Sequence, residues 1–108
     1  MVKLMALYRK PADVQAFEEH YAGVHLPLVE KIPGLRKTEL SRITGAPRGE
    51  APYYMMHEMY FDDMDAYNQA MMSEENKAAG KDLMSFARDI VTLMVADVYE
   101  DAVKKDDK

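Results

Sequence analysis

Residues 17–28 read FEEHYAGVHLPL, a stretch that places an ionisable imidazole near the end of an amphipathic helix. Apolar side chains recur at helical spacing along it and predict a buried stripe of Phe17, Tyr21, Val24 and Leu28. His25 falls at the margin of that stripe, about 80° around the helix from Phe17 at roughly 100° per residue. Pro27 lacks a backbone N–H and disfavours helical geometry at the preceding residue, so we expect the helix to break or kink beside His25. His25 is therefore the first candidate for a functional side chain.

Around this helix, the pattern of apolar residues predicts the order strand, helix, strand, strand, helix, strand. The strands are expected over residues 2–9, 35–43, 53–61 and 90–99. Two strand–helix–strand halves in this split order are typical of the ferredoxin-like fold. The sequence therefore predicts an α+β protein whose sheet has four antiparallel strands.

Capping residues set the expected helix limits. Asp13 is a candidate N-cap for the first helix, which is expected to run to about Leu26. Asp62 or Asp63 is the candidate N-cap for the second helix. Another helical turn is expected after Ser73, with Gly80 as its C-cap, and a short helix is expected to restart over residues 82–86. At 108 residues the chain is one domain, predicted to cover residues 1–101 and to be followed by a charged, flexible tail over residues 102–108.

The predicted strands carry apolar side chains on both faces. Helices in this fold cover one sheet face only, so the second face needs a partner. A second copy of the chain under twofold symmetry is the simplest partner. We therefore expect a homodimer that encloses a barrel-like core with a cavity in each subunit.

The strand predicted over residues 53–61 divides its side chains between two faces. We assign the more apolar set, which contains Met55, Met59 and Phe61, to the helices. The other set, expected to face the dimer cavity, consists of Tyr54, Met56, Glu58 and Tyr60. His57 falls on the helix side and needs a polar partner there. If the two faces are exchanged, His57 becomes the cavity residue and Glu58 is structural.

Several short motifs carry a family resemblance. They are YRKP at residues 8–11, FEEHYAGVHLPL at residues 17–28, PGLR at residues 33–36, EMYFD at residues 58–62 and SEE at residues 73–75. Together they resemble the EthD family of the dimeric α/β-barrel superfamily, over nearly the whole chain. The resemblance implies a dimeric α/β barrel in which His25 lies near the mouth of a cavity. Related families include lactone isomerases, polyketide cyclases or decarboxylases, and cofactor-free monooxygenases.

The resemblance and the residue types together suggest roles in proton transfer. His25 and Glu58 are the predicted catalytic residues, since a histidine titrates near neutral pH and a carboxyl group in an apolar barrel can act as an acid. The residues predicted to bind substrate are Tyr54, Tyr60, Tyr8 and Met56, with the phenols as donors to an enolate or carbonyl oxygen. The expected ligand is a small, mainly apolar, oxygenated ring such as a lactone, a quinone or a polyketide-like compound.

Two other functions remain open on the sequence: a ligand-binding accessory protein without catalysis, and a haem-binding or haem-degrading protein with His25 as axial ligand. No cofactor is expected otherwise. A metal site is not expected either, because His20 and His25 would lie about 140° apart on an α-helix and the chain has no cysteine. His20 is interpreted as a partly exposed helix histidine.

Composition narrows the class of partner. The net charge of −5 argues against nucleic acid, whose phosphates require clustered Lys and Arg. The chain shows neither a long apolar run nor a signal-peptide cleavage pattern, and it has no cysteine for a disulfide framework. We therefore expect a cytoplasmic protein that does not bind membranes.

Overall fold

The computed structural model describes residues 1–99. Its elements are β1 (Val2–Tyr8), α1 (Val14–His20), η1 (Tyr21–His25), α2 (Leu26–Val29), β2 (Lys37–Arg42), β3 (Met55–Phe61), α3 (Met64–Met71), α4 (Glu74–Ala87) and β4 (Val91–Asp97). The predicted tail over residues 102–108, and the end of the predicted domain at residue 101, lie outside the described residues.

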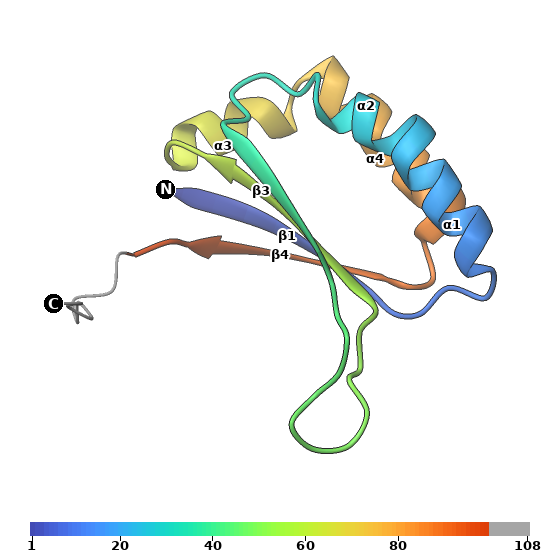
Figure 1. Ribbon diagram of the computed structural model, residues 1–108. Coiled ribbons are helices and arrows are strands. Elements are labelled where there is room, and N and C mark those ends of the chain that lie inside the picture. Colours follow the sequence, from blue (N-terminus) through green and yellow to red (C-terminus); the bar gives the residue numbers. More distant parts are fainter. Residues whose placement is uncertain (100–108) are drawn as a thin grey trace, which may run out of the picture.

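The four strands form one sheet in the order β2-β3-β1-β4, and every neighbouring pair is antiparallel. All the helices lie against one face of this twisted sheet, which leaves the other face open (Figure 1). The predicted α+β, ferredoxin-like fold with a four-stranded antiparallel sheet is confirmed. No helix within residues 1–99 is both long enough and apolar enough to cross a bilayer.

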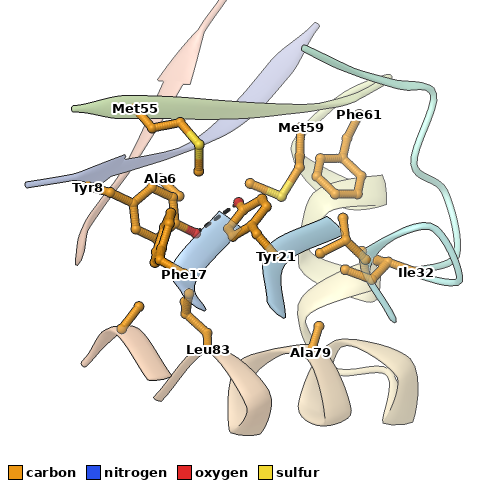
Figure 2. Close-up of a cluster of buried hydrophobic side chains, with 13 residues drawn as sticks. Ala6, Tyr8, Phe17, Tyr21, Ile32, Met55, Met59, Phe61, Ala79 and Leu83 are labelled. Carbon is orange, nitrogen blue, oxygen red and sulfur yellow. Dashed lines mark hydrogen bonds between the residues drawn. The ribbon is translucent and has the colours of Figure 1, made fainter. Parts of the chain in front are cut away.

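The core lies between the sheet and the helices. Met55, Met59 and Phe61 of β3 point toward the helices together with Ala6 and Tyr8 of β1, as Figure 2 shows. Phe17 of α1 and Tyr21 of η1 pack their rings edge-on to the ring of Tyr8, with centroids 5.4 Å away in both cases. The predicted assignment of the two β3 faces is therefore confirmed for residues 55–61, and His57 is buried beneath the helices.

The helix that carries His25 does not break at Pro27. Tyr21–His25 form one π-helical turn, in which the N–H of Leu26 bonds to the carbonyl oxygen of Tyr21, and the chain then continues as α2 to Val29. Of the break or kink predicted beside His25, the break does not occur, and the helix geometry changes there through the π turn instead. The wider turn inserts one extra residue at this point, and Pro27 then lies in the first turn of α2, where a missing N–H is tolerated.

Helix α4 also differs from its prediction, because it runs without interruption through Gly80. Ser73 is its N-cap, with a side chain that accepts a hydrogen bond from the N–H of Asn76 at 3.1 Å. A single glycine costs a helix only about 1 kcal/mol relative to alanine, which packing against the rest of the domain offsets. The predicted C-cap at Gly80 and the separate helix over residues 82–86 were wrong.

Candidate functional site

A cavity of about 350 Å³ lies between the helix face of the sheet and the helices. Strands β1, β3 and β4 line one side of it, and η1, α2, α3 and α4 line the other. Its apolar wall includes Leu4, Val29, Ile32, Met59, Met71 and Leu83. Polar atoms come from Tyr8, His25, Tyr67 and Asn76. The volume falls in the usual range for small-molecule sites, and so does a mainly apolar wall with a few polar groups.

His25 is buried, with only 4% of its surface exposed, and it lines this cavity. Its Nδ1 lies 3.0 Å from Oδ2 of Asp82 on α4. Because a carboxylate can only accept, Nδ1 carries the proton and donates it, and the neutral ring keeps its lone pair on Nε2. Nε2 makes no hydrogen bond within the described part of the chain, so the basic nitrogen is the one left for a ligand in the cavity.

The π turn explains how two histidines reach the same carboxylate. Its hydrogen bonds join residues five apart, so His20 and His25 come to one side of the helix instead of lying about 140° apart as on an α-helix. His20 Nε2 lies 2.9 Å from Oδ1 of Asp82, while His25 uses Oδ2. Phe86 packs against both imidazole rings, with centroids 4.4 Å and 5.4 Å away. A metal-binding group of three His, Cys, Asp or Glu residues is not found among residues 1–99.

Burial lowers the pKa of His25, because the charged imidazolium is poorly solvated there. The hydrogen bond and the negative charge of Asp82 act in the opposite direction and raise it. Burial is the larger effect, so the ring is neutral at physiological pH. A neutral imidazole with an oriented lone pair can act as a general base.

A second buried chain of polar groups begins at the cavity wall. The hydroxyl of Tyr8 lies 2.9 Å from the hydroxyl of Tyr21, which in turn lies 2.7 Å from Nδ1 of His57 (Figure 2 shows the tyrosine pair). Burial raises the pKa of Tyr8 to about 12 and lowers that of His57 to about 4, so all three groups are neutral at physiological pH. Tyr21 is thus the polar partner that His57 needs beneath the helices. Nε2 of His57 has no hydrogen-bond partner among residues 1–99.

Three of the predicted site residues lie on the opposite face of the sheet. Met56, Glu58 and Tyr60 point to the open face, away from His25. Glu58 forms an ion pair with Lys3 at 2.5 Å, and Tyr60 donates a hydrogen bond of 3.0 Å to Glu39. The structure therefore brings His25 and Tyr8 to one cavity and leaves Glu58, the other predicted catalytic residue, on the far side of the sheet.

Tyr54 does not share a face with Glu58, contrary to the prediction. Strand β3 begins at Met55, so the alternation does not extend to Tyr54. The Tyr54 hydroxyl donates to Glu18 on α1, which also pairs with Arg42 at 2.6 Å. These contacts raise the pKa of Tyr54 and lower that of Glu18, where Arg42 is the main cause. Tyr54 thus ties the end of the sheet to α1 and does not line the cavity.

Comparison with known proteins assigns the chain to a family. A family model described as the EthD domain matches residues 9–90. The chain belongs to the EthD family. An EthD family protein of Bacillus halodurans has a crystal structure that superposes with a TM-score of 0.88, at 52% identity over 92% of this chain and 99% of that one.

Two further proteins extend the EthD comparison. An uncharacterized 11.0 kDa protein from the thcB-thcC intergenic region of Rhodococcus erythropolis is 31% identical over 90% of this chain and 94% of its own length. A Bacteroides fragilis protein of unknown function, described as dimeric with a ferredoxin-like fold, is 20% identical and has a TM-score of 0.61 over 90% of this chain and 95% of its own. The similarity to the Bacteroides fragilis protein concerns the fold alone.

Sequence reasoning missed Asp82, Tyr67 and Asn76 as parts of the candidate site. Asp82 was interpreted only as a residue that restarts a helix. One local signal was available, since the i, i+4 pair of Asp82 and Phe86 places a carboxylate next to an aromatic ring on one helix face.

A larger and more open hollow of about 750 Å³ lies between the start of α1 and the end of α4, and it contains His20 but not His25.

Proposed function

We propose that this EthD-family chain is a small-molecule enzyme that moves a proton on an apolar, oxygenated ligand held in the cavity. One observation carries the proposal: Nδ1 of His25 is held by Asp82, and the ring lines an apolar cavity with Nε2 free. Such a base would abstract an acidic proton from a carbon or oxygen atom of the ligand and return it elsewhere. Lactones, hydroxyquinones and polyketide-like rings carry protons of this kind.

The hydroxyl of Tyr8 can stabilise the anion that forms when the proton is removed. Tyr8 lines the cavity and its hydroxyl is bonded to that of Tyr21, so we propose that it accepts from Tyr21 while it donates to an oxygen of the ligand. That donation would stabilise the oxyanion that develops as His25 removes a proton. Proton abstraction requires only a base and a group that stabilises the anion, so we propose that the reaction uses no cofactor.

The decisive experiment measures proton transfer directly. The protein is incubated in D₂O with α-angelica lactone, 1,4-naphthohydroquinone or anthrone, and exchange of their acidic C–H or ring protons is followed by ¹H NMR. We expect catalysed exchange with at least one of these compounds and its loss in His25→Gln. The exposed substitution Glu19→Gln serves as the control and should exchange at the wild-type rate.

Other outcomes would support other functions. Binding of a probe without exchange would favour an accessory binding protein, and a Soret band that forms on haem titration and is lost in His25→Gln would favour the haem alternative. Exchange that survives His25→Gln in a folded protein would remove His25 from the proposed mechanism.

We also propose a homodimer formed through the open sheet face. In a single chain that face carries the partly exposed apolar side chains of Met5, Leu7 and Met56, together with Met94, which is 45% exposed. Two such faces placed together under twofold symmetry would bury them. The Bacteroides fragilis protein of the same fold is described as dimeric, which supports a dimer for this chain.

A further inference from the structure

The residues that line the cavity are uncharged. Among the described residues, Lys, Arg, Asp and Glu are all absent from its wall. Behind the wall, His25 is hydrogen-bonded to the carboxylate of Asp82, which does not itself line the cavity. An anionic ligand would therefore leave water without gaining a positive partner, and it would approach a negative charge. Both effects oppose the binding of carboxylates.

The polar groups on the wall lie toward its two ends. His25 is at the level of Asp82 on α4, and Asn76 precedes Asp82 by six residues, so its side chain starts about 9 Å away along the helix axis at 1.5 Å per residue. Asn76 lines the cavity together with Tyr67 of α3. Apolar side chains and Gly80 occupy the wall between these two ends.

The distant polar pair keeps hydrogen-bonding capacity for a ligand. The amide nitrogen of Asn76 donates to the carbonyl oxygen of Met71 at 3.3 Å, which leaves its own carbonyl oxygen to accept. The ring of Tyr67 packs edge-on against Phe61 at 5.7 Å, and its hydroxyl forms no hydrogen bond within residues 1–99. A hydroxyl group of a ligand would satisfy both groups, since it can accept from the Tyr67 hydroxyl and donate to the carbonyl oxygen of Asn76.

We infer that the cavity selects an uncharged ligand with an oxygen function at each end, one beside Nε2 of His25 and the other beside Tyr67 and Asn76. This inference rests on the proposed function, because it takes the same cavity as the ligand site. Tyr67 and Asn76 are specificity residues that position the ligand, while His25 remains the reacting group.

Three fluorescent naphthalenes test the inference on the wild-type protein at neutral pH. They are 2,6-dihydroxynaphthalene, with an oxygen at each end, 2-naphthol, with one oxygen, and 6-hydroxy-2-naphthoic acid, with a carboxylate at one end. Binding is measured by fluorescence titration. We expect the diol to bind about fivefold more tightly than 2-naphthol, the gain of one net hydrogen bond. The acid should bind at least about tenfold more weakly than the diol, because its charge is buried without a partner.

Two variants locate the second oxygen site. Tyr67→Phe and Asn76→Leu should each lower the affinity for the diol toward that for 2-naphthol and leave the affinity for 2-naphthol unchanged. Tyr99→Phe and Asn68→Leu are matched controls at exposed positions and should bind all three probes as the wild type does. If Asn76→Leu does not fold, Tyr67→Phe and the comparison of the three probes on the wild type still test whether the cavity holds a second oxygen site.

The outcomes separate this inference from the proposed function. Equal or tighter binding of the acid, or unchanged binding of the diol by folded Tyr67→Phe and Asn76→Leu, would overturn the inference even if proton exchange occurs. The expected order of affinities without any proton exchange would support the ligand class and count against the catalytic role of His25.

Discussion

Nδ1 of His25 and Oδ2 of Asp82 lie 3.0 Å apart, although the two residues are 57 positions apart in the chain. This contact joins the π turn to α4 and determines which nitrogen of the imidazole faces the cavity. His20 binds the other oxygen of the same carboxylate, so both oxygens are engaged. The chemistry proposed for the cavity therefore depends on a residue that makes no contact with the ligand itself.

Replacing Asp82 by Asn should impair proton transfer without emptying the cavity. An amide can also donate, so the His25 ring would be free to adopt the wrong tautomer, and exchange should fall by roughly 10²–10⁴-fold. The pKa of His25 should fall as well, because Asp82 raises it. Exchange rates and an NMR titration of the imidazole measure the two effects. Asp89→Asn, at an exposed position, is the control. A wild-type exchange rate in folded Asp82→Asn would mean that Asp82 does not orient the base.

Acid should destabilise the protein through His57. Burial lowers its pKa from 6.5 to about 4, so the unfolded chain binds a proton between these values while the folded protein does not. The contribution of the neutral His57 ring to the free energy of unfolding is fully present above about pH 6.5 and is lost as the pH falls toward 4. We expect the free energy of unfolding to fall by about 2 kcal/mol between about pH 7 and pH 5. Urea unfolding at the two pH values measures the loss. His57→Phe should lose less stability over this interval; an identical loss would exclude His57 as the source.

Gly80 offers a way to fill the cavity. It lines the cavity, and a Cβ atom built there meets no atom within 4 Å. Gly80→Ala should therefore raise the free energy of unfolding by about 1 kcal/mol through helix propensity. Gly80→Leu should fold but bind 2-naphthol poorly, because its side chain occupies the ligand space. Gly23→Ala is the matched control, since Gly23 is also helical and free of neighbours but lies outside the cavity wall. Undiminished binding by Gly80→Leu would place the ligand elsewhere.

Glu58→Gln distinguishes the sequence-based site from the cavity. Because Glu58 lies on the far side of the sheet, exchange should stay within about twofold of the wild type, while the free energy of unfolding falls by roughly 1–3 kcal/mol as Lys3 loses its partner. The double variant Lys3→Met with Glu58→Met should recover that stability. A large loss of exchange in Glu58→Gln would restore Glu58 as a catalytic residue.

The open sheet face should control assembly. Met5 lies at its centre, paired with Glu58 on one side and Met94 on the other. Met5→Glu should shift the protein from dimer to monomer in sedimentation equilibrium, because two carboxylates would meet at a closed interface. Met72→Glu changes an exposed methionine on the helix side and should leave the dimer intact. A dimer that persists in Met5→Glu would place the interface on another surface.

Local patterns in the sequence were sufficient for the order of the elements and for the two faces of β3. Alternation over residues 55–61 predicted the buried face of β3 correctly. The predicted helical stripe holds for Phe17 and Tyr21, but beyond them the π turn leaves Val24 exposed and buries His25 instead. Asp13 and Ser73 acted as N-caps because capping depends on neighbours three residues away. The family resemblance rested on the same short stretches.

The tertiary structure alone decided which polar groups meet. The contact between His25 and Asp82 joins elements that are distant in the chain, and the cavity is assembled from three strands and three helices. Packing also selected the π turn that brings His20 and His25 to one carboxylate, since a helical pattern read at 3.6 residues per turn predicts the opposite. The sequence by itself thus determined the buried face of β3 and of the first helix up to Tyr21, because burial there follows local periodicity. The site depended on how the helices pack on the sheet, because that packing brings together side chains whose spacing along the chain carries no signal.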